Sequence, residues 1–200
     1  RISLPPETRY ILYAPLGDRI VKVGDRIIKH TYDRDAINFL TEHLPSDYKI
    51  IVRSPPTDTV NLEGLANPSK VIIERPGHSF GDSVKNVRAT ELTVDDDRRL
   101  RESILHAEAV LTVFSSICID AVVLGKPAVL LGCDFSPTSY WESVSRLHEF
   151  DHIQPLSGLV SMVKTAAELA MIVKQVEEGV VTLKREEIIR EQCYKIDGQA

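Results

Sequence analysis

The chain has 200 residues, of which 43% are hydrophobic and 26% are charged, and its formal net charge is −5. This length fits one large domain with a substantial core, and the composition is ordinary for a soluble globular protein. The acidic balance disfavours a general nucleic-acid-binding protein, which usually carries a basic excess or a basic stripe. It does not disfavour a small anionic ligand held in one local site.

The cysteines and the chain start bear on location. Cys118, Cys133 and Cys193 are far apart, resemble no zinc site and are odd in number, so we expect a reducing, cytoplasmic setting. Residues 1–7 are polar and contain proline, unlike a signal peptide, and no apolar run approaches the roughly 20 residues of a membrane helix. We therefore expect no integral membrane segment and a cytoplasmic location, either free or at the periphery of a membrane.

Short apolar runs alternate with longer amphipathic stretches along the chain. In chain order they predict a strand at 10–14, a helix at 33–44, strands at 49–53 and 71–74, a helix at 95–107, a strand at 109–114, a helix at 116–124, a strand at 127–131, and helices at 159–173 and 182–194. Residues 132–157 fit no clean period, and we expect an irregular loop there. Alternating strands and helices predict a single α/β domain over residues 1–200, a Rossmann-like three-layer αβα sandwich with a mainly parallel sheet.

The strand at 109–114 leads directly into Ser115, Ser116 and a helix. In open parallel sheets, ligands bind outside the carboxyl ends of the strands. Serine hydroxyls, free backbone N–H groups of the first helical turn and the helix dipole together favour a phosphate at this position. Asp120 follows Ser116 by four residues on the same helix face, where a carboxylate can accept hydrogen bonds from sugar hydroxyls. Taken alone, the serines are better explained by an ordinary helix cap, and Asp120 by an exposed helix residue; the surrounding pattern favours the phosphate site.

The segment at 107–131 resembles the donor-binding half of the GT-B glycosyltransferases, and most of all the group of CDP-glycerol glycerophosphotransferases and capsular-polysaccharide transferases. That group shows the pattern A-D-x-x-(I/V)-T-x-x-S-S-x-x-x-(D/E)-A-x-x-x-x-K-P. The residues in register with it are Ser115, Ser116, Asp120, Lys126 and Pro127, whereas Glu108 replaces the usual aspartate.

Weaker matches to the same group follow in the expected order. Residues 10–15 resemble its first strand, I-L-Y-A-P, and residues 194–198 resemble its D-G close. Residues 51–55 lie where such proteins often carry (K/R)-P-H-P, but the histidine of that motif is absent here.

The resemblance implies the C-terminal half of a two-domain enzyme. This half would hold a nucleotide-activated sugar or polyol donor, while an N-terminal acceptor domain outside these residues would hold the acceptor and often a catalytic base. The residues expected to bind the donor are Ser115, Ser116, Asp120, Arg53, Arg75, His78, Gly17 and Asp134. No catalytic residue is assigned, and neither a cofactor nor a metal is expected, because GT-B enzymes generally need no bound metal.

Each of the outlying candidates has a specific reason. Arg53 ends a strand, and its planar fork suits a diphosphate, although a salt bridge is the plain alternative. Arg75 and His78 flank the loop that contacts the nucleobase in related domains. Gly17 permits close backbone approach, as it would in any turn. Asp134 follows the strand at 127–131, where sugar-transferring relatives contact a hydroxyl.

Two further features each have two possible interpretations. Tyr140 and Trp141 would either line the donor cleft or cover the core edge, and we favour core cover. The run Asp95 to Asp97 is better explained by charge at a helix N-terminus than by a metal site, because consecutive carboxylates point in different directions around a helix.

Three functions remain in competition. The first is a transferase that moves a glycosyl or polyol-phosphate group to a polysaccharide-type acceptor. The second is an isomerase of the UDP-N-acetylglucosamine 2-epimerase type, which shares the fold but carries S-G-G where this chain has residues 114–116. The third is a non-catalytic nucleotide-binding module, which the lack of a recognisable base in this half keeps open.

Overall fold

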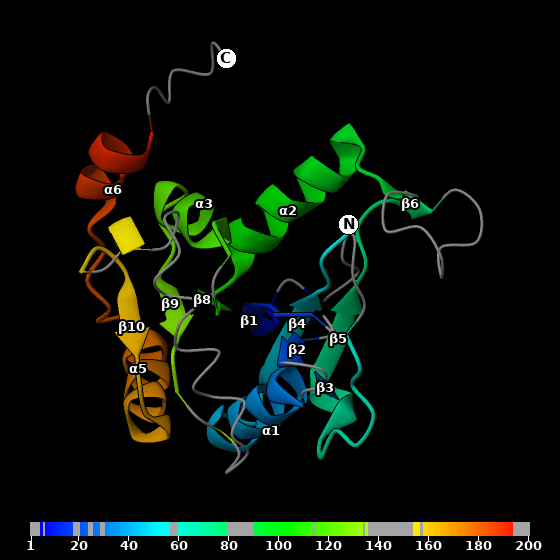
Figure 1. Ribbon diagram of the computed structural model, residues 1–200. Coiled ribbons are helices and arrows are strands. Elements are labelled where there is room, and N and C mark those ends of the chain that lie inside the picture. Colours follow the sequence, from blue (N-terminus) through cyan, green and yellow to red (C-terminus); the bar gives the residue numbers. More distant parts are fainter. Residues whose placement is uncertain are drawn as a thin grey trace.

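The computed structural model describes residues 5, 7–17, 21–23, 26–28, 31–56, 60–79, 90–113, 115–133, 135, 154–156 and 158–193. A six-stranded parallel sheet forms the centre, with the spatial order β10-β9-β8-β1-β4-β5 (Figure 1). Its strands are β1 (Arg9–Ala14), β4 (Tyr48–Arg53), β5 (Val71–Glu74), β8 (Ala109–Thr112), β9 (Ala128–Leu131) and β10 (Ser161–Val163). Strands added after β1 first extend the sheet in one direction and then in the other, which is the strand order of the Rossmann fold.

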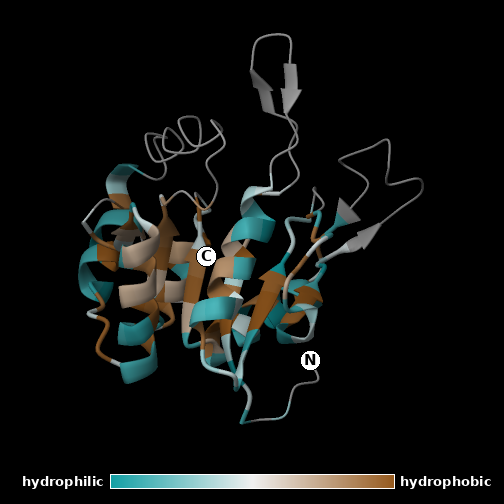
Figure 2. Cartoon of the chain, turned by 90° about the horizontal axis from the view of Figure 1, so that it is seen from below, coloured by the Kyte–Doolittle hydropathy of each residue, from teal (hydrophilic) through white to brown (hydrophobic). Residues whose placement is uncertain are grey.

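Helices cover both faces of this sheet, which confirms the three-layer prediction. On one face lie α1 (Tyr32–His43) and α5 (Ala166–Glu178), and on the other lie α2 (Val94–His106), α3 (Ile117–Val123) and α6 (Arg185–Gln192) (Figure 1). Figure 2 shows hydrophobic strands enclosed between helices whose outer sides are hydrophilic. Among the described residues, no helix combines the length and the hydropathy that a membrane crossing requires.

The central strand β1 is buried on both faces of the sheet. Its side chains alternate between the two cores, so that Tyr13 packs with the α1 and α5 layer while Leu12 packs with the α2, α3 and α6 layer. Leu12 pairs with Ile51 of β4 on one side and with Val110 of β8 on the other. A strand enclosed in this way must be apolar at consecutive positions, as the sequence of residues 10–14 is.

Two short antiparallel pairs lie outside the main sheet and were not predicted. The first joins β2 (Val21–Val23) to β3 (Arg26–Ile28), and the second joins β6 (His78–Ser79) to β7 (Thr90–Glu91). Short single-turn helices occur at η1 (Pro68–Lys70) and η3 (Gln154–Leu156). The remainder of the loop expected at 132–157 lies almost wholly outside the described residues.

The predicted helix at 159–173 is wrong in its first part. Residues 161–163 form β10, which pairs with the otherwise open edge of β9, and Gly132 N donates to Val163 O at 2.6 Å. The helix begins only at Ala166, after Thr165, whose side chain accepts a hydrogen bond from Glu168 N at 3.1 Å. Apolar spacing continued across this boundary, so the period alone did not reveal the cap. The last helix is also shorter than predicted, spanning α6 instead of 182–194.

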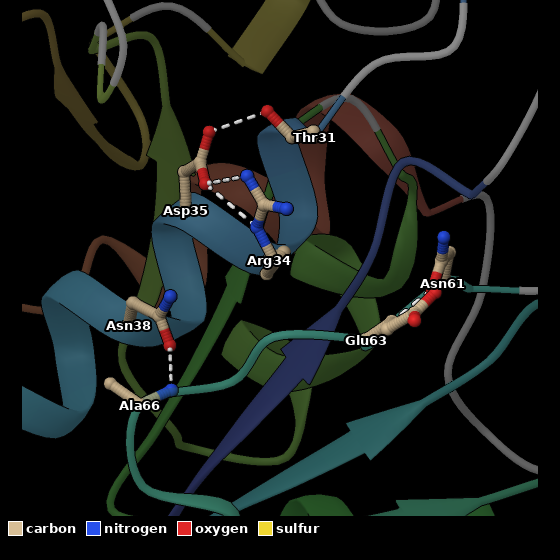
Figure 3. Close-up of polar contacts among 7 residues, drawn as sticks. All are labelled: Thr31, Arg34, Asp35, Asn38, Asn61, Glu63 and Ala66. Atoms are coloured by element: carbon tan, nitrogen blue, oxygen red, sulfur yellow. Dashed lines mark hydrogen bonds and ion pairs between the residues drawn. The ribbon is translucent and has the colours of Figure 1, made fainter.

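The connection between β4 and β5 is fastened to α1. Figure 3 shows this connection running beside the helix, where Asn38 Oδ1 accepts a hydrogen bond from Ala66 N at 2.9 Å. Near the start of α1, Thr31 Oγ1 donates to Asp35 at 2.6 Å, and Arg34 forms an ion pair with Asp35 at 2.9 Å (Figure 3). The Asn38 contact ties α1 to the connection that leads into β5, whereas the other two contacts are local to the N-terminal part of the helix.

Lys70 closes the C-terminal end of α1, and its replacement by methionine should destabilise the fold. Lys70 Nζ donates to the carbonyl oxygens of Thr41, Leu44 and Pro45 at 3.1, 3.1 and 3.2 Å. Carbonyls at a helix end lack partners within the helix and carry partial negative charge, so a cation there is favourable. We expect Lys70→Met to lower the free energy of unfolding by about 1–2 kcal/mol in urea titrations. Lys174→Met, at an exposed site on α5, should change it by less than about 0.5 kcal/mol.

Candidate functional site

A crevice opens at the carboxyl ends of the central strands. Neighbouring strands β1 and β8 lie where the strand order reverses, and the connections that follow them leave for opposite faces of the sheet through α1 and α3. Such a switch point is where open α/β sheets bind ligands. The cavity has a volume of about 280 Å³ and is lined by Ala14, Pro15, Arg53, Ser54, Pro55, Pro56, Pro76, Leu92, Asp97, Leu100, Ser115, Ser116, Ile117 and Asp120.

The two serines of the strand-to-helix turn both line this crevice. Ser116 occupies the N-cap position of α3, yet within the described part of the chain its side chain makes no capping hydrogen bond, and it is exposed. Ser115 Oγ accepts only a long hydrogen bond from Ile117 N, at 3.4 Å, and Ser115 N donates to Thr112 Oγ1 at the same distance. An ordinary capping role therefore does not account for the Ser116 hydroxyl.

Asp120 lies on the crevice side of α3, one turn after Ser116. Its side chain keeps contact with solvent, but the protein atoms around it remove part of its hydration and raise the pKa of the carboxyl. The turn after α3 is formed as expected, with Gly125 at a φ of 78° and its N–H donating to Val122 O. The sequence pattern from Ser115 to Gly125 thus brings its polar members to one wall of the cavity.

Arg53 reaches the crevice from the end of β4 and is held in a buried ion pair. Its Nη1 lies 2.8 Å from Glu74 Oε2, and the side chains of Arg53 and Glu74 are only 9% and 11% exposed. The two residues are register partners on β4 and β5. Arg53 Nη2 also donates to the backbone oxygen of Asp96 at 3.1 Å. The interpretation of Arg53 as part of a salt bridge is therefore correct, and the pair is buried instead of lying at the surface.

Asp96 fastens the loop after β5 to the start of α2. It forms a capping box with Thr93, and its Oδ1 accepts a hydrogen bond from Gly77 N at 3.0 Å. The backbone N–H groups of Gly77 and Thr93, followed by the Thr93 hydroxyl, stabilise the carboxylate and hold its pKa well below the usual range. Asp95 pairs instead with Arg98 at 3.1 Å. Asp96 therefore serves the N-terminus of α2, whereas Asp97 lines the crevice. The described residues contain no group of three or more His, Cys, Asp or Glu placed to hold a metal.

The loop after β1 is shaped by a buried carboxylate that sequence reasoning did not assign to the site. Asp33, 3% exposed, accepts hydrogen bonds from Tyr13 Oη at 2.6 Å, Leu16 N at 2.8 Å and Gly17 N at 2.9 Å. Gly17 has a φ of 89°, a conformation that favours glycine. The Gly17 amide therefore stabilises the turn after β1, and this turn holds Pro15 in the wall of the crevice.

The structure brings four of the eight expected donor-binding residues together: Ser115, Ser116, Asp120 and Arg53. Arg75 is exposed after β5, and neither Arg75 nor Gly17 belongs to the lining of the crevice. His78 begins β6, but its side chain lies outside the described residues, as do Asp134, Tyr140 and Trp141.

Several lining residues escaped sequence reasoning, among them Ser54, Pro55, Pro56, Asp97 and Leu100. The proline pair that follows Ser54 after β4 was a usable signal, since it comes after a strand on the ligand edge. Asp97 and Leu100 had none, because their placement depends on how α2 packs across the sheet.

The strand order and the switch-point crevice define a Rossmann-like α/β domain with the geometry of a ligand-binding site. Solved structures of the wall teichoic acid polymerase TagF, a GT-B protein, share this fold. One TagF variant is 20% identical with a TM-score of 0.56, covering 98% of this chain and 42% of that one. A second variant is 16% identical with a TM-score of 0.55, covering 99% and 42%. A form soaked with CDPG is 17% identical with a TM-score of 0.54, covering 98% and 40%.

This likeness shows that the chain has the fold of part of a GT-B structure, as expected from the sequence. The chain spans about two fifths of the length of these polymerase structures. No family model matches the chain, and no curated protein sequence matches it significantly.

Proposed function

We propose that this chain is the donor-binding half of a transferase that moves a glycosyl or polyol-phosphate group from a nucleoside diphosphate donor to a polysaccharide-type acceptor. The observation that carries the proposal is the switch-point crevice, which unites Ser115, Ser116, Asp120 and Arg53. The fold of the polymerase TagF, one form of which was soaked with CDPG, supports a nucleotide donor of the CDP-glycerol kind.

The proposed chemistry places the diphosphate of the donor against the two serines and Arg53. Negative charge builds on the diphosphate as the bond to the transferred group breaks, and hydroxyl and guanidinium donors aimed at that charge lower the barrier. Asp120, on the same wall, accepts hydrogen bonds from donor hydroxyls. The donor is a substrate, no cofactor takes part, and the base that activates the acceptor belongs to an N-terminal acceptor domain.

The size of the cavity is consistent with a donor site that this domain shares with an acceptor domain. Its volume of about 280 Å³ is slightly below the range of small-molecule pockets, which extends from about 300 to 1,000 Å³. It therefore holds only part of a nucleotide-activated donor, and the remainder would lie between this domain and the acceptor domain. Such an enzyme would work in the cytoplasm or at the periphery of a membrane.

A donor screen tests this proposal. The chain should be titrated with CDP-glycerol and with CMP-, UDP- and GDP-activated sugars, with the melting temperature and then calorimetric affinity as readouts. One class of nucleotide should raise the melting temperature, since a ligand that binds only the folded state stabilises it. If every nucleotide leaves the melting temperature unchanged, the donor-binding function is wrong.

Binding should also depend on pH through Asp120. The ionised carboxylate accepts hydrogen bonds from donor hydroxyls, and its raised pKa means that protonation begins at a higher pH than for an ordinary aspartate. Affinity should therefore fall as the pH is lowered from about 7.5 to about 4.5 in calorimetric titrations. Asp120→Asn should bind more weakly at neutral pH and lose this dependence. Identical pH profiles for the two proteins would remove Asp120 from the site.

A further inference from the structure

The cation of the proposed donor site is already neutralised by the protein itself. Glu74 Oε2 lies 2.8 Å from Arg53 Nη1, and about nine tenths of each side chain is buried. Burial, and after it the Glu74 charge, raises the pKa of the nearby Tyr10 hydroxyl to about 12. At a buried position, this attraction is much stronger than it would be in water.

The ion pair is incompletely satisfied. Among the described residues, no hydrogen-bond donor reaches Glu74 Oε1, and Arg53 Nη1 has the ion-pair distance to Glu74 but not the direction of a good hydrogen bond. Ser103 Oγ approaches Glu74 Oε2 only at 3.4 Å. A buried pair with unsatisfied atoms is less stable than a fully bonded one, so Arg53 retains capacity for another anion.

The rest of the crevice does not supply the missing positive charge. Arg53 is the only cationic side chain among its described lining residues, whereas Asp97 and Asp120 are carboxylates. A diphosphate entering the crevice therefore competes directly with Glu74 for the guanidinium. The remaining polar side chains of the lining are the hydroxyls of Ser54, Ser115 and Ser116, and neutral donors discriminate less strongly by charge.

We infer that Glu74 sets the anion affinity of this site by competing with the diphosphate of the donor for Arg53. The inference rests on the proposed function and adds a specificity-determining residue to it. Glu74 stabilises Arg53 in the empty domain and weakens the binding of small free anions. A donor that also contacts the crevice through its nucleoside and its hydroxyls overcomes this competition, whereas free phosphate or pyrophosphate does not.

The test uses Glu74→Gln and inorganic pyrophosphate, a probe that carries the charge but no nucleoside. Pyrophosphate affinity, measured by calorimetry at fixed ionic strength, should increase by about tenfold, because one charged hydrogen-bond competitor is removed. The melting temperature without ligand should fall by roughly 10 °C, because a buried ion pair is broken. A purely structural role for Glu74 would lower stability and leave affinity unchanged or reduced, and that result would overturn the inference.

Three further variants make the outcome decisive. Glu74→Asp keeps the charge but shortens its reach, so it should fold readily and still tighten pyrophosphate binding by roughly threefold; an unchanged affinity contradicts the inference even if Glu74→Gln does not fold. In an Arg53→Met background, Glu74→Gln should give no gain. Glu102→Gln, the same charge change at an exposed position on α2, should shift affinity by less than about twofold.

Different results would overturn the proposed function and the inference about Glu74. If no nucleotide donor binds the unmodified chain, the donor-binding function is wrong whatever pyrophosphate does. If a donor binds but neither Glu74 variant tightens pyrophosphate, the function stands and the role of Glu74 is overturned.

Discussion

Replacing Ser116 with tryptophan should abolish donor binding while leaving the fold intact. Ser116 is exposed at the N-terminus of α3 and lines a cavity of about 280 Å³. Because its hydroxyl makes no capping bond within the described structure, its loss removes little stability. A tryptophan side chain buries 150–250 Å² when it packs and would occupy the space proposed for the diphosphate. We expect affinity for the donor identified by screening to fall at least about 100-fold in calorimetry, equivalent to about 2.7 kcal/mol.

A second tryptophan variant separates blockage from a general effect of a large aromatic. Lys174→Trp places the same side chain at an exposed position on α5, on the opposite face of the sheet. Donor affinity and melting temperature should both remain close to those of the unmodified chain. Wild-type affinity in Ser116→Trp would show that the serine turn does not form the binding site, wherever else the nucleotide binds.

The largest loss of stability is expected from Asp33→Ala. This buried carboxylate accepts hydrogen bonds from the Tyr13 hydroxyl and from the amides of Leu16 and Gly17. Its removal leaves three donors without their partner in a region that excludes water, and each such donor costs about 1–3 kcal/mol. We expect the free energy of unfolding to fall by about 3–5 kcal/mol in urea titrations.

The neighbouring hydroxyl provides a graded comparison for this loss. Tyr13→Phe removes one donor and leaves the Asp33 contacts with both amides, so it should lower the free energy of unfolding by only about 1 kcal/mol. Equal losses in the two variants would show that the amide contacts contribute nothing. Asp33→Ala should also weaken donor binding, because the loop that places Pro15 in the crevice wall loses its anchor.

The central layer of the fold was predictable from the sequence because its physical causes are local. Short apolar runs alternating with amphipathic stretches predicted five of the six sheet strands. The exception, β10, is an edge strand of only three residues that merges into the apolar pattern of α5. Periodicity does not reveal such a strand, because its formation depends on the open edge of β9 and not on its own residues.

The candidate site was predictable to the extent that it follows strand ends. Ser115, Ser116 and Arg53 were found in this way, since each comes at the carboxyl end of a strand. Glu74 also ends a strand, but its pairing with Arg53 depends on the register of β4 against β5. Asp33 is the first residue of the helix predicted at 33–44, but its hydrogen bonds to the loop after β1 depend on the tertiary structure.

The central position of β1 has a consequence for biosynthesis. This strand is translated before every other strand of the main sheet, yet its partner β8 follows about a hundred residues later. Until β8 emerges from the ribosome, one edge of an apolar strand has no pairing partner, and such an edge promotes aggregation. The nascent chain therefore cannot complete the crevice until Ser115 and Asp120 have been synthesised, and any truncation before β8 removes these two residues and leaves β1 paired with β4 alone.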